Sequence, residues 1–301
     1  MTVYNLGSIN ADYLYQVPHI PAPGETLAAT HLEKGLGGKG ANQSVAIRMS
    51  GAEVLHIGAV GEDGAWLTAR LRSLGVNTSG VVQLDGASGH GIISIAPDGE
   101  NAITLFPGTN ITISSDMVSS WLSEIGPQDW LVLQNETSQQ RMAAALAKTK
   151  GASVVYSAAP FDADMVASVI DCVDILCVNE HEAASLIEAR DLINLEDLGV
   201  GAMLITYGAQ GAAYHDFVSE TVSLVGGHSV NVVDTTGAGD TFCGYFIGRL
   251  SQGDDPKEAL NIANKASALQ VTRAGTADAI PTLEEVQALK VLWGGEISKV
   301  L

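Results

Sequence analysis

Residues 130–156 read WLVLQNETSQQRMAAALAKTKGASVVY, which is a short apolar run, a stretch of helix-forming residues and a second apolar run. Trp130–Gln134 and Ser153–Tyr156 have the length and the aliphatic content of buried strands. Ser138–Lys150 between them is rich in Ala, Met, Leu and Lys, which favour a helix. A strand, a helix and another strand in this order are typical of neighbouring parallel strands joined by a crossover helix.

The same alternation continues on both sides of this segment. Further apolar runs that predict strands are Val3–Ile9, Val54–Val60, Ile175–Val178 and Met203–Thr206. Ala65–Leu74 has helical spacing, and the sequence after Asp234 is mostly helical in pattern. We therefore expect an α/β fold with a doubly wound, mainly parallel sheet flanked by helices, built as a single domain over residues 1–301.

Two segments do not follow this alternation of strands and helices. Residues 11–35 contain several prolines between alternating apolar positions, and residues 89–107 contain two short strand-like runs, His90–Ala96 and Ala102–Phe106. The four-residue loop Pro97-Asp98-Gly99-Glu100 between these runs carries an Asp-Gly pair, which favours a hairpin. We expect these two inserts to form a small antiparallel β-sheet, which is either a lid over a cleft or a peripheral extension.

The charge balance excludes several classes of partner. The chain has 34 acidic and 15 basic residues, a net charge of −19, and no run of Lys or Arg. A protein that neutralises a nucleic acid or an anionic membrane needs a basic face, so we expect neither as a partner. Three cysteines without a CxxC pair indicate neither a disulfide framework nor a zinc site. With no signal-peptide pattern and no apolar run of ~20 residues, we expect a cytoplasmic protein.

The strongest local motif is Asp234-Thr235-Thr236-Gly237-Ala238-Gly239-Asp240, a glycine-rich loop that runs into a helical pattern. Free N–H groups of Gly237, Ala238 and Gly239, together with the helix dipole, would form a site for an anion such as a phosphoryl group. Asp240 would repel that anion unless it accepts a proton from an attacking hydroxyl. The alternative is an ordinary helix start with an acidic residue in its first turn.

A second glycine-rich stretch is Gly35-Leu36-Gly37-Gly38-Lys39-Gly40-Ala41-Asn42. It matches the dinucleotide pattern G-x-G-x-x-G, but a polar segment precedes it where a Rossmann strand is needed, and Lys39 is not followed by Ser or Thr as in a Walker A loop. Bare backbone at Gly37 and Gly38 permits close approach of a polyhydroxyl ligand, to which Lys39 and Asn42 can donate hydrogen bonds. The alternative is a tight turn before a helix.

Polar residues also follow three predicted strands, where ligands of parallel sheets bind. Asn10 and Asp12 have the same parity, and a carboxylate such as Asp12 can accept hydrogen bonds from adjacent sugar hydroxyls. Asn179 and Glu182 suit either a helix capping box or support of water-bound Mg²⁺ beside phosphates. The segment Thr206-Tyr207-Gly208-Ala209-Gln210-Gly211 suits either a nucleotide cradle or a plain turn.

The order of these motifs resembles the ribokinase (PfkB) family of carbohydrate kinases along essentially the whole chain. Residues 37–43 are similar to the first signature of that family, and residues 234–242 are similar to the second. Gly7-Ser8-Ile9-Asn10-Ala11-Asp12, with Pro23-Gly24-Glu25-Thr26, resembles the ribokinase branch more than the fructokinases or adenosine kinases. The resemblance implies a doubly wound α/β core with a β-sheet lid, through which a homodimer often forms.

The resemblance also implies roles for individual residues. Asp240 would be the catalytic base, and Gly237, Ala238 and Gly239 would stabilise charge on the transferred phosphoryl group. The sugar would be held by Asn10, Asp12, Gly38, Lys39, Asn42 and Glu136, with Asp240 at its reacting hydroxyl. ATP would contact Asn179, Thr206, Gly208, Gly211, Gly239 and Asn264, and Glu182 would place Mg²⁺ through water. Asp234, Thr236 and Gly275 would hold an activating K⁺.

The implied activity is transfer of the γ-phosphoryl group of ATP to the primary hydroxyl of a small sugar, D-ribose above all. Alternatives are fructose, deoxyribose or a nucleoside as acceptor, a catalytically silent regulator that binds sugar or nucleotide, and, far behind, an NAD-binding oxidoreductase. Two positions depart from the family pattern. Ala279 stands where a Ser is frequent near the cation loop, and Asn135 stands beside Glu136 where an apolar residue is frequent.

Overall fold

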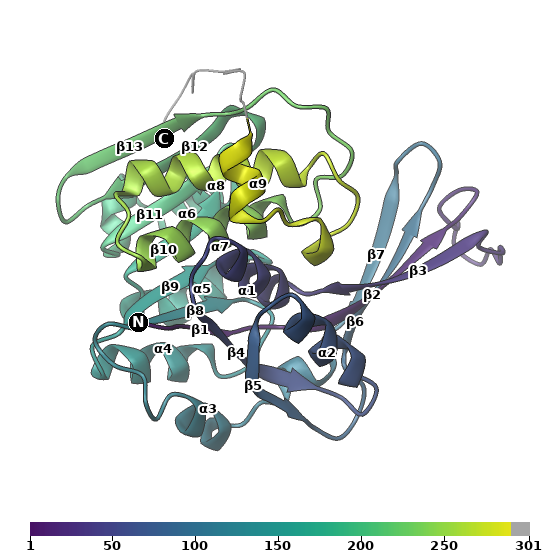
Figure 1. The fold of residues 1–301 in the computed structure, drawn as a ribbon, viewed down its shortest axis with the longest axis horizontal. Helices are drawn as coiled ribbons and strands as arrows, with labels where there is room; N and C mark the ends of the chain where they lie inside the picture. The colour runs from purple at the N-terminus through teal and green to yellow at the C-terminus, as the bar shows by residue number, and fades with distance from the viewer. Residues whose placement is uncertain (290–301) are drawn as a thin grey trace.

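The computed structural model describes residues 1–289 and contains two β-sheets (Figure 1). The larger sheet has nine strands in the described residues, in the order β13-β12-β11-β10-β9-β8-β1-β4-β5. Its strands are β1 (Val3–Leu6), β4 (Val54–Val60), β5 (Asn77–Gln83), β8 (Trp130–Gln134), β9 (Ser153–Ser157), β10 (Ile175–Asn179), β11 (Ala202–Thr206), β12 (Gly211–Asp216) and β13 (Thr221–Gly226). All neighbours from β11 to β5 are parallel, whereas β12 and β13 add an antiparallel edge.

The second sheet projects from the body of the molecule, as Figure 1 shows. Its strands follow the order β3-β2-β6-β7, with bounds β2 (Asn10–Gln16), β3 (His31–Gly37), β6 (Gly89–Ile95) and β7 (Asn101–Phe106). β2 with β3 and β6 with β7 form antiparallel pairs, and β2 pairs with β6 in parallel. The small sheet therefore consists of two antiparallel hairpins that meet along a parallel seam.

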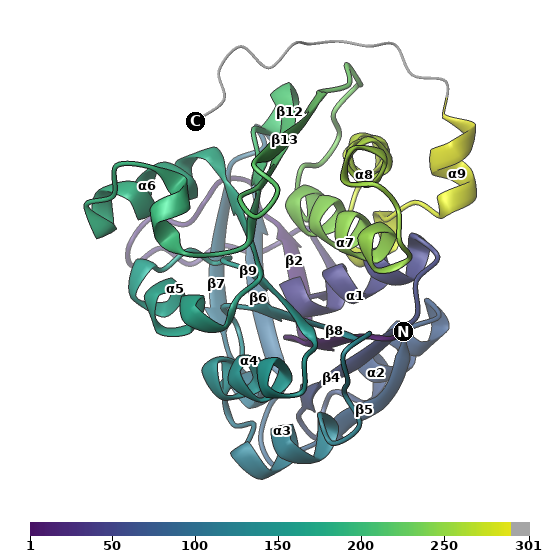
Figure 2. The same cartoon turned by 90° about the vertical axis from the view of Figure 1, so that its left-hand side faces the viewer.

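Helices cover both faces of the large sheet (Figure 2). The α-helices are α1 (Lys39–Met49), α2 (Ala65–Ser73), α3 (Ser115–Trp121), α4 (Gln140–Thr149), α5 (Ala163–Val169), α6 (Glu180–Arg190), α7 (Ala238–Ser251), α8 (Pro256–Gln270) and α9 (Leu283–Ala288). Short 3₁₀ segments are η1 (Gly108–Ile111), η2 (Ile170–Cys172), η3 (Leu195–Leu198), η4 (Gly208–Gln210) and η5 (Ala277–Ala279). In residues 1–289 no helix combines the length and the apolar character needed to cross a membrane.

Two apolar cores lie on opposite faces of the large sheet. Val155 and Leu204 point to the face covered by α1, α7 and α8, where they join Ile47 and Phe246. The alternate strand residues, such as Tyr156, point to the face covered by α3 to α6. Strands buried on both faces explain why they appear in the sequence as continuous apolar runs.

The predicted fold class is confirmed, with local differences. The run Val3–Ile9 is not one strand, because β1 ends at Leu6 and the chain crosses to the second sheet at Asn10. The polar stretch before Gly37 is part of the insert 11–35, which was expected to contribute to the small sheet. It forms β3, whose partners are in the second sheet rather than in a parallel β-α-β unit, so the Rossmann arrangement is still absent.

Candidate active site

The loop before α7 ends in a helix N-terminus that opens on a cavity. Gly237 is the N-cap with φ +78°, a conformation that suits glycine, and α7 begins at Ala238. Apart from its chain neighbours and the backbone of α7 itself, no heavy atom lies within 4 Å of the position that a Cβ of Gly239 would occupy. The first turn of α7 therefore presents bare backbone to open space, as an anion-binding helix N-terminus requires.

Asp240, in the first turn of α7, is 8% exposed and is held by two amide side chains from α1. Nδ2 of Asn42 donates to its Oδ2 over 3.0 Å, and Nε2 of Gln43 donates to its Oδ1 over 3.0 Å. The Oε1 atom of Gln43 in turn accepts from Gln134 Nε2 over 2.8 Å. The carboxylate thus keeps one orientation beside the anion site, where a proton acceptor is useful.

The start of α1 brings Glu136 to the same region. Gly38 is the N-cap of α1 with φ +93°, and a Cβ there would lie 2.9 Å from the carbonyl oxygen of Ser8. The backbone N–H of Lys39 donates to Oε2 of Glu136 over 2.9 Å, and the Ser8 hydroxyl donates to the same oxygen. Glu136 therefore keeps Oε1 for a ligand hydroxyl.

Asp12 and Asn10 lie on the same face of β2, at the start of the second sheet, just after the chain has left β1 of the large sheet. A Cβ on Gly37 would come within 1.9 Å of Asp12 Oδ2, so glycine at this position makes room for the carboxylate. Burial, with a smaller contribution from Glu136, raises the pKa of Asp12 to about 7. Asn110 Nδ2 donates to Asn10 Oδ1 over 2.8 Å and fixes that side chain.

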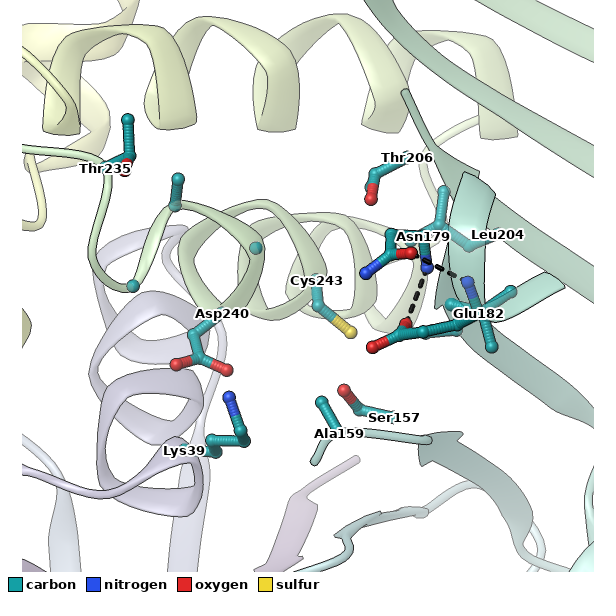
Figure 3. A pocket seen from close by; sticks show the side chains of 15 residues that line it. Lys39, Ser157, Ala159, Asn179, Glu182, Leu204, Thr206, Thr235, Asp240 and Cys243 are labelled. Atoms are coloured by element: carbon teal, nitrogen blue, oxygen red, sulfur yellow. Dashed lines mark hydrogen bonds between the residues drawn. The ribbon is translucent and has the colours of Figure 1, made fainter. Parts of the chain in front are cut away.

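Two adjoining cavities extend from Asp240 along the carboxyl ends of the strands. The cavity of about 200 Å³ is lined by Asp240, Gly237–Gly239, Lys39, Asn179 and Glu182, among others (Figure 3). The cavity of about 440 Å³ is lined by Gly208, Gly211 and Asn264, among others. Thr206, Thr235, Ala238 and Gly239 line both, so the two cavities meet at the N-terminus of α7.

Asn179 and Glu182 form a capping box at the start of α6, as one of the two sequence interpretations predicts. Asn179 N donates to Glu182 Oε2 over 2.8 Å, and Glu182 N donates to Asn179 Oδ1 over 2.9 Å (Figure 3). Burial raises the pKa of Glu182, while the charge of Lys39 lowers it. Because Oε1 of Glu182 takes no part in the cap, the same side chain can cap the helix and face the cavity.

The predicted cation loop is closed by hydrogen bonds. Asp234 Oδ1 accepts from Thr236 N over 2.9 Å, and Oδ2 accepts from Gly275 N over 3.0 Å. The carbonyl oxygens of Thr236 and Gly275 accept from Nε2 of Gln270 over 2.9 and 3.2 Å. In residues 1–289 no group of three or more His, Cys, Asp or Glu side chains is arranged to hold a metal ion.

Most of the predicted site residues come together along this cleft. Asn135 is engaged by the neighbouring strand and loop, since its Nδ2 donates to Pro160 O over 2.9 Å and its Oδ1 accepts from the Tyr156 hydroxyl. Sequence reasoning missed the supporting roles of Asn110, Gln43 and Gln270. Gln43 adjoins Asn42 in the first signature, and Gln270 begins the segment 270–281 that resembles the second cation-binding loop of the family, whereas nothing near Asn110 in the sequence distinguishes it from an ordinary polar residue.

Residues 2–283 match the family described as "pfkB family carbohydrate kinase". The chain is 34% identical over 300 residues to a ribokinase of Haemophilus influenzae, covering 94% of this chain and 96% of the relative. It is 31% identical over 299 residues to a deoxyribokinase of Salmonella typhi, covering 95% and 97% of the two chains. The Arabidopsis thaliana ribokinase complexed with ribose and ATP superposes with a TM-score of 0.83 at 27% identity, covering 95% and 97%.

These matches agree with what lines the cavities: a glycine-rich helix N-terminus, a buried acid held beside it and polar side chains at the strand ends. Such a cleft suits phosphoryl transfer to an alcohol, which needs mainly positioning and charge stabilisation. The chain therefore belongs to the pfkB family of carbohydrate kinases and is a phosphotransferase with an alcohol group as acceptor.

Proposed function

We propose that this kinase transfers the γ-phosphoryl group of ATP to the 5-hydroxyl of D-ribose and forms ribose 5-phosphate. The observation that carries the proposal is the buried Asp240 carboxylate, which lies at the N-terminus of α7 between the predicted sugar residues and the cavity predicted for phosphate. The similarity to curated ribokinases over 94% of the chain supports ribose as the acceptor. Deoxyribose is the second candidate, because a deoxyribokinase is 31% identical.

The sugar would lie between Asp12, Asn42 and Glu136, with Asn10, Gly38 and Lys39 around it. Carboxylates of Asp12 and Glu136 accept hydrogen bonds from neighbouring hydroxyl groups, and the Asn42 amide provides a donor. In the same pocket Asp240 would accept the proton of the primary hydroxyl as that oxygen attacks phosphorus. The Asn42–Asp240 hydrogen bond would hold the base at a constant position relative to the sugar pocket.

ATP would occupy the two adjoining cavities. The larger cavity, lined by Gly208, Gly211 and Asn264, suits the nucleoside, and the smaller one suits the phosphates. Backbone N–H groups of Gly237 and Gly239 would stabilise the charge that develops on the transferred group. The N–H of Ala238, predicted to share this role, instead donates to the carbonyl oxygen of Thr235 over 3.2 Å. Asn264 Nδ2 is engaged with Gly226 O over 2.8 Å, which leaves its Oδ1 for an adenine amino group.

Glu182 fits a Mg²⁺ ion held through water, because its Oε1 takes no part in the capping box and its side chain lines the phosphate cavity. Mg²⁺ bound there with the nucleotide would neutralise phosphate charge. Asn179 would remain a phosphate neighbour at the N-terminus of α6, whose dipole also favours negative charge.

We further propose that the second sheet, formed by inserts 11–35 and 89–107, is a lid that excludes water from the sugar and mediates a homodimer. The face of this sheet that carries Asp12 also carries Leu14, Ile93, Ile103 and Leu105. Ile103 and Leu105 are 54% and 55% exposed. A second copy of the chain would cover this apolar surface and extend the wall of the sugar pocket.

The decisive experiment is a coupled ADP-release assay with Mg-ATP across pentoses, hexoses and nucleosides. We expect the highest kcat/KM with ribose and formation of ribose 5-phosphate, identified by mass and by phosphorus NMR. A higher kcat/KM with deoxyribose would assign the second candidate. Turnover of neither pentose, with ATP still bound in a calorimetric titration, would contradict the proposed substrate and favour a regulator that binds nucleotide.

A further inference from the structure

Gln270, the last residue of α8, is fully buried, and its side-chain amide joins two loops. Its Nε2 atom donates to the carbonyl oxygen of Thr236 over 2.9 Å and to that of Gly275 over 3.2 Å. A primary amide has two N–H donors, so both are used. The reverse orientation would set Oε1 against two carbonyl oxygens, so the hydrogen-bond pattern itself fixes the amide.

The two carbonyl groups belong to residues at which a potassium ion is expected from the family resemblance. K⁺ is held in proteins by oxygen atoms that replace its hydration shell. Here Nε2 of Gln270 lies 2.9 and 3.2 Å from the two carbonyl oxygens, at the position from which a cation would have to contact both. The carboxylate of Asp234 is directed at the backbone N–H groups of Thr236 and Gly275. Ala279, buried nearby in η5, offers only a methyl group where a hydroxyl oxygen is frequent in the family. The residues present therefore do not fit the cation.

We propose that the amide of Gln270 takes the place of the monovalent cation in this chain, so that the kinase does not require K⁺. The amide bridges Thr236, which immediately precedes the N-cap Gly237, to the loop at Gly275. The next residue of that loop, Thr276, donates from Oγ1 to Leu36 O over 2.9 Å, beside Gly37 of the sugar pocket. Gln270 thus links the anion site to the sugar loop.

Gln270 acts here as a positioning residue, because its contacts are with backbone carbonyls and not with the reacting groups. The conformation of the Thr236–Gly239 segment decides where its N–H groups point, and small displacements of such donors reduce their stabilisation of developing charge. The amide of Gln270 is part of the chain, so it joins Thr236 to the loop at Gly275 whichever salt is present. An exchangeable cation would provide this link only above its dissociation constant.

The first test compares KCl with choline chloride at equal ionic strength on the wild-type chain. We expect initial rates of ADP release that agree within about twofold and melting temperatures that agree within about 1 °C, because a solute without a site stabilises nothing. Activation by K⁺ of about tenfold or more, together with a higher melting temperature, would overturn the proposal. The melting temperature does not depend on the sugar, so it separates this inference from the substrate assignment.

The second test rebuilds the oxygen site with the double variant Gln270→Ala and Ala279→Ser. Without K⁺ we expect its melting temperature to fall by roughly 3–8 °C, since two buried carbonyls lose their donor. KCl, but not choline chloride, should restore the melting temperature and raise kcat. The matched control is Gln252→Ala, which changes an exposed glutamine at the end of α7 and should behave as the wild type.

If KCl changes the melting temperature and kcat of the double variant no more than those of the wild type, the amide does not occupy a cation position, and the proposal is overturned. The single variant Gln270→Ala serves as a second measurement if the added hydroxyl of the double variant prevents folding. If neither variant folds in either salt, the comparison of KCl with choline chloride on the wild-type chain decides alone.

Discussion

Asn42 Nδ2 donates a hydrogen bond to Asp240 Oδ2 over 3.0 Å, although 198 positions separate the two residues in the chain. Asn42 lies in α1, directly after the loop predicted to hold the sugar, and Asp240 lies in the first turn of α7, after the loop predicted to hold the phosphoryl group. This contact, with the one from Gln43 to the same carboxylate, joins the two halves of the predicted site. It also means that displacement of the sugar loop would move the proton acceptor with it.

Asp240→Asn should lower kcat by ~10²–10⁴-fold if the carboxylate accepts the proton of the sugar hydroxyl. An amide of nearly the same shape cannot take up that proton, while the phosphate cavity keeps its lining. The dissociation constant for ATP, measured by titration calorimetry, should change little. Turnover equal to that of the wild type would remove Asp240 from the role of general base.

Gln43→Leu should reduce kcat by about tenfold, since Asp240 Oδ1 loses the donor that fixes the carboxylate. The apparent KM for ATP should stay nearly constant, because Gln43 does not line the nucleotide cavity. Gln252→Ala, at an exposed position, is the control. A loss confined to the KM for ATP, with kcat retained, would show that Gln43 does not act through the base.

Asp12 should make sugar binding depend on pH near neutrality. Burial, and secondly Glu136, raise the pKa of Asp12 to about 7, so that the empty pocket holds a proton below that pH. Sugar hydroxyls donate to the ionised carboxylate, so the KM for the sugar should fall as the pH rises from about 6 to about 8. Asp12→Asn should abolish this trend and raise the sugar KM at all pH values.

The raised pKa of Asp12 also predicts how stability changes with pH. Between the unfolded value of 3.8 and the folded value of about 7, the folded state binds more protons than the unfolded state. The free energy of unfolding therefore decreases as the pH rises through this window, by at most about 4 kcal/mol from this group. Urea titrations at several pH values should show Asp12→Asn gaining stability relative to the wild type toward pH 8. A difference in unfolding free energy between the two proteins that does not change with pH would contradict the raised pKa of Asp12.

Gly239→Ala should fold normally but bind ATP about tenfold or more weakly. A Cβ at this position meets no protein atom within 4 Å, so the free chain accommodates it. The methyl group would instead project into the space assigned to phosphate and shield the backbone N–H groups. Melting temperatures and calorimetric titrations separate the two effects. Unimpaired ATP affinity would place the phosphates elsewhere.

Leu105→Lys should disrupt a homodimer formed through the second sheet. Leu105 is 55% exposed and lies on the face that carries Asp12, so a partner chain would have to bury the new charge. Thr104→Lys is the matched control, because its side chain lies on the opposite face of the same strand. Analytical ultracentrifugation should find monomers only for Leu105→Lys. Monomeric wild-type protein, or dissociation by both substitutions, would contradict this interface.

Local patterns were sufficient to predict much of the framework. Trp130–Gln134 is predicted as a strand with the bounds that β8 has in the structure, because a strand buried on both faces leaves a continuous apolar run. The turn between β6 and β7 and the start of α7 are similarly marked by Asp-Gly and Gly-Ala-Gly-Asp. The antiparallel strands β12 and β13 were not predicted. β12 is buried but reads Gly-Ala-Ala-Tyr-His-Asp, which is no aliphatic run, and the edge strand β13 is largely exposed.

The sequence by itself determined the α/β class, the two glycine-rich loops and the kinase family, because those depend on residue periodicity and on motifs within a few residues. Only the tertiary structure decided that Asn42 and Gln43 hold Asp240, that Asn135 bonds to Pro160, and that Gln270 joins the loops at Thr236 and Gly275. Each of these is a hydrogen bond between side chains or loops brought together by packing. The direction of a side chain depends on residues that are distant in the sequence, so it is fixed only when their helices, strands and loops pack together. The tendency of a segment to form a helix or a strand is local and can be recognised from the sequence.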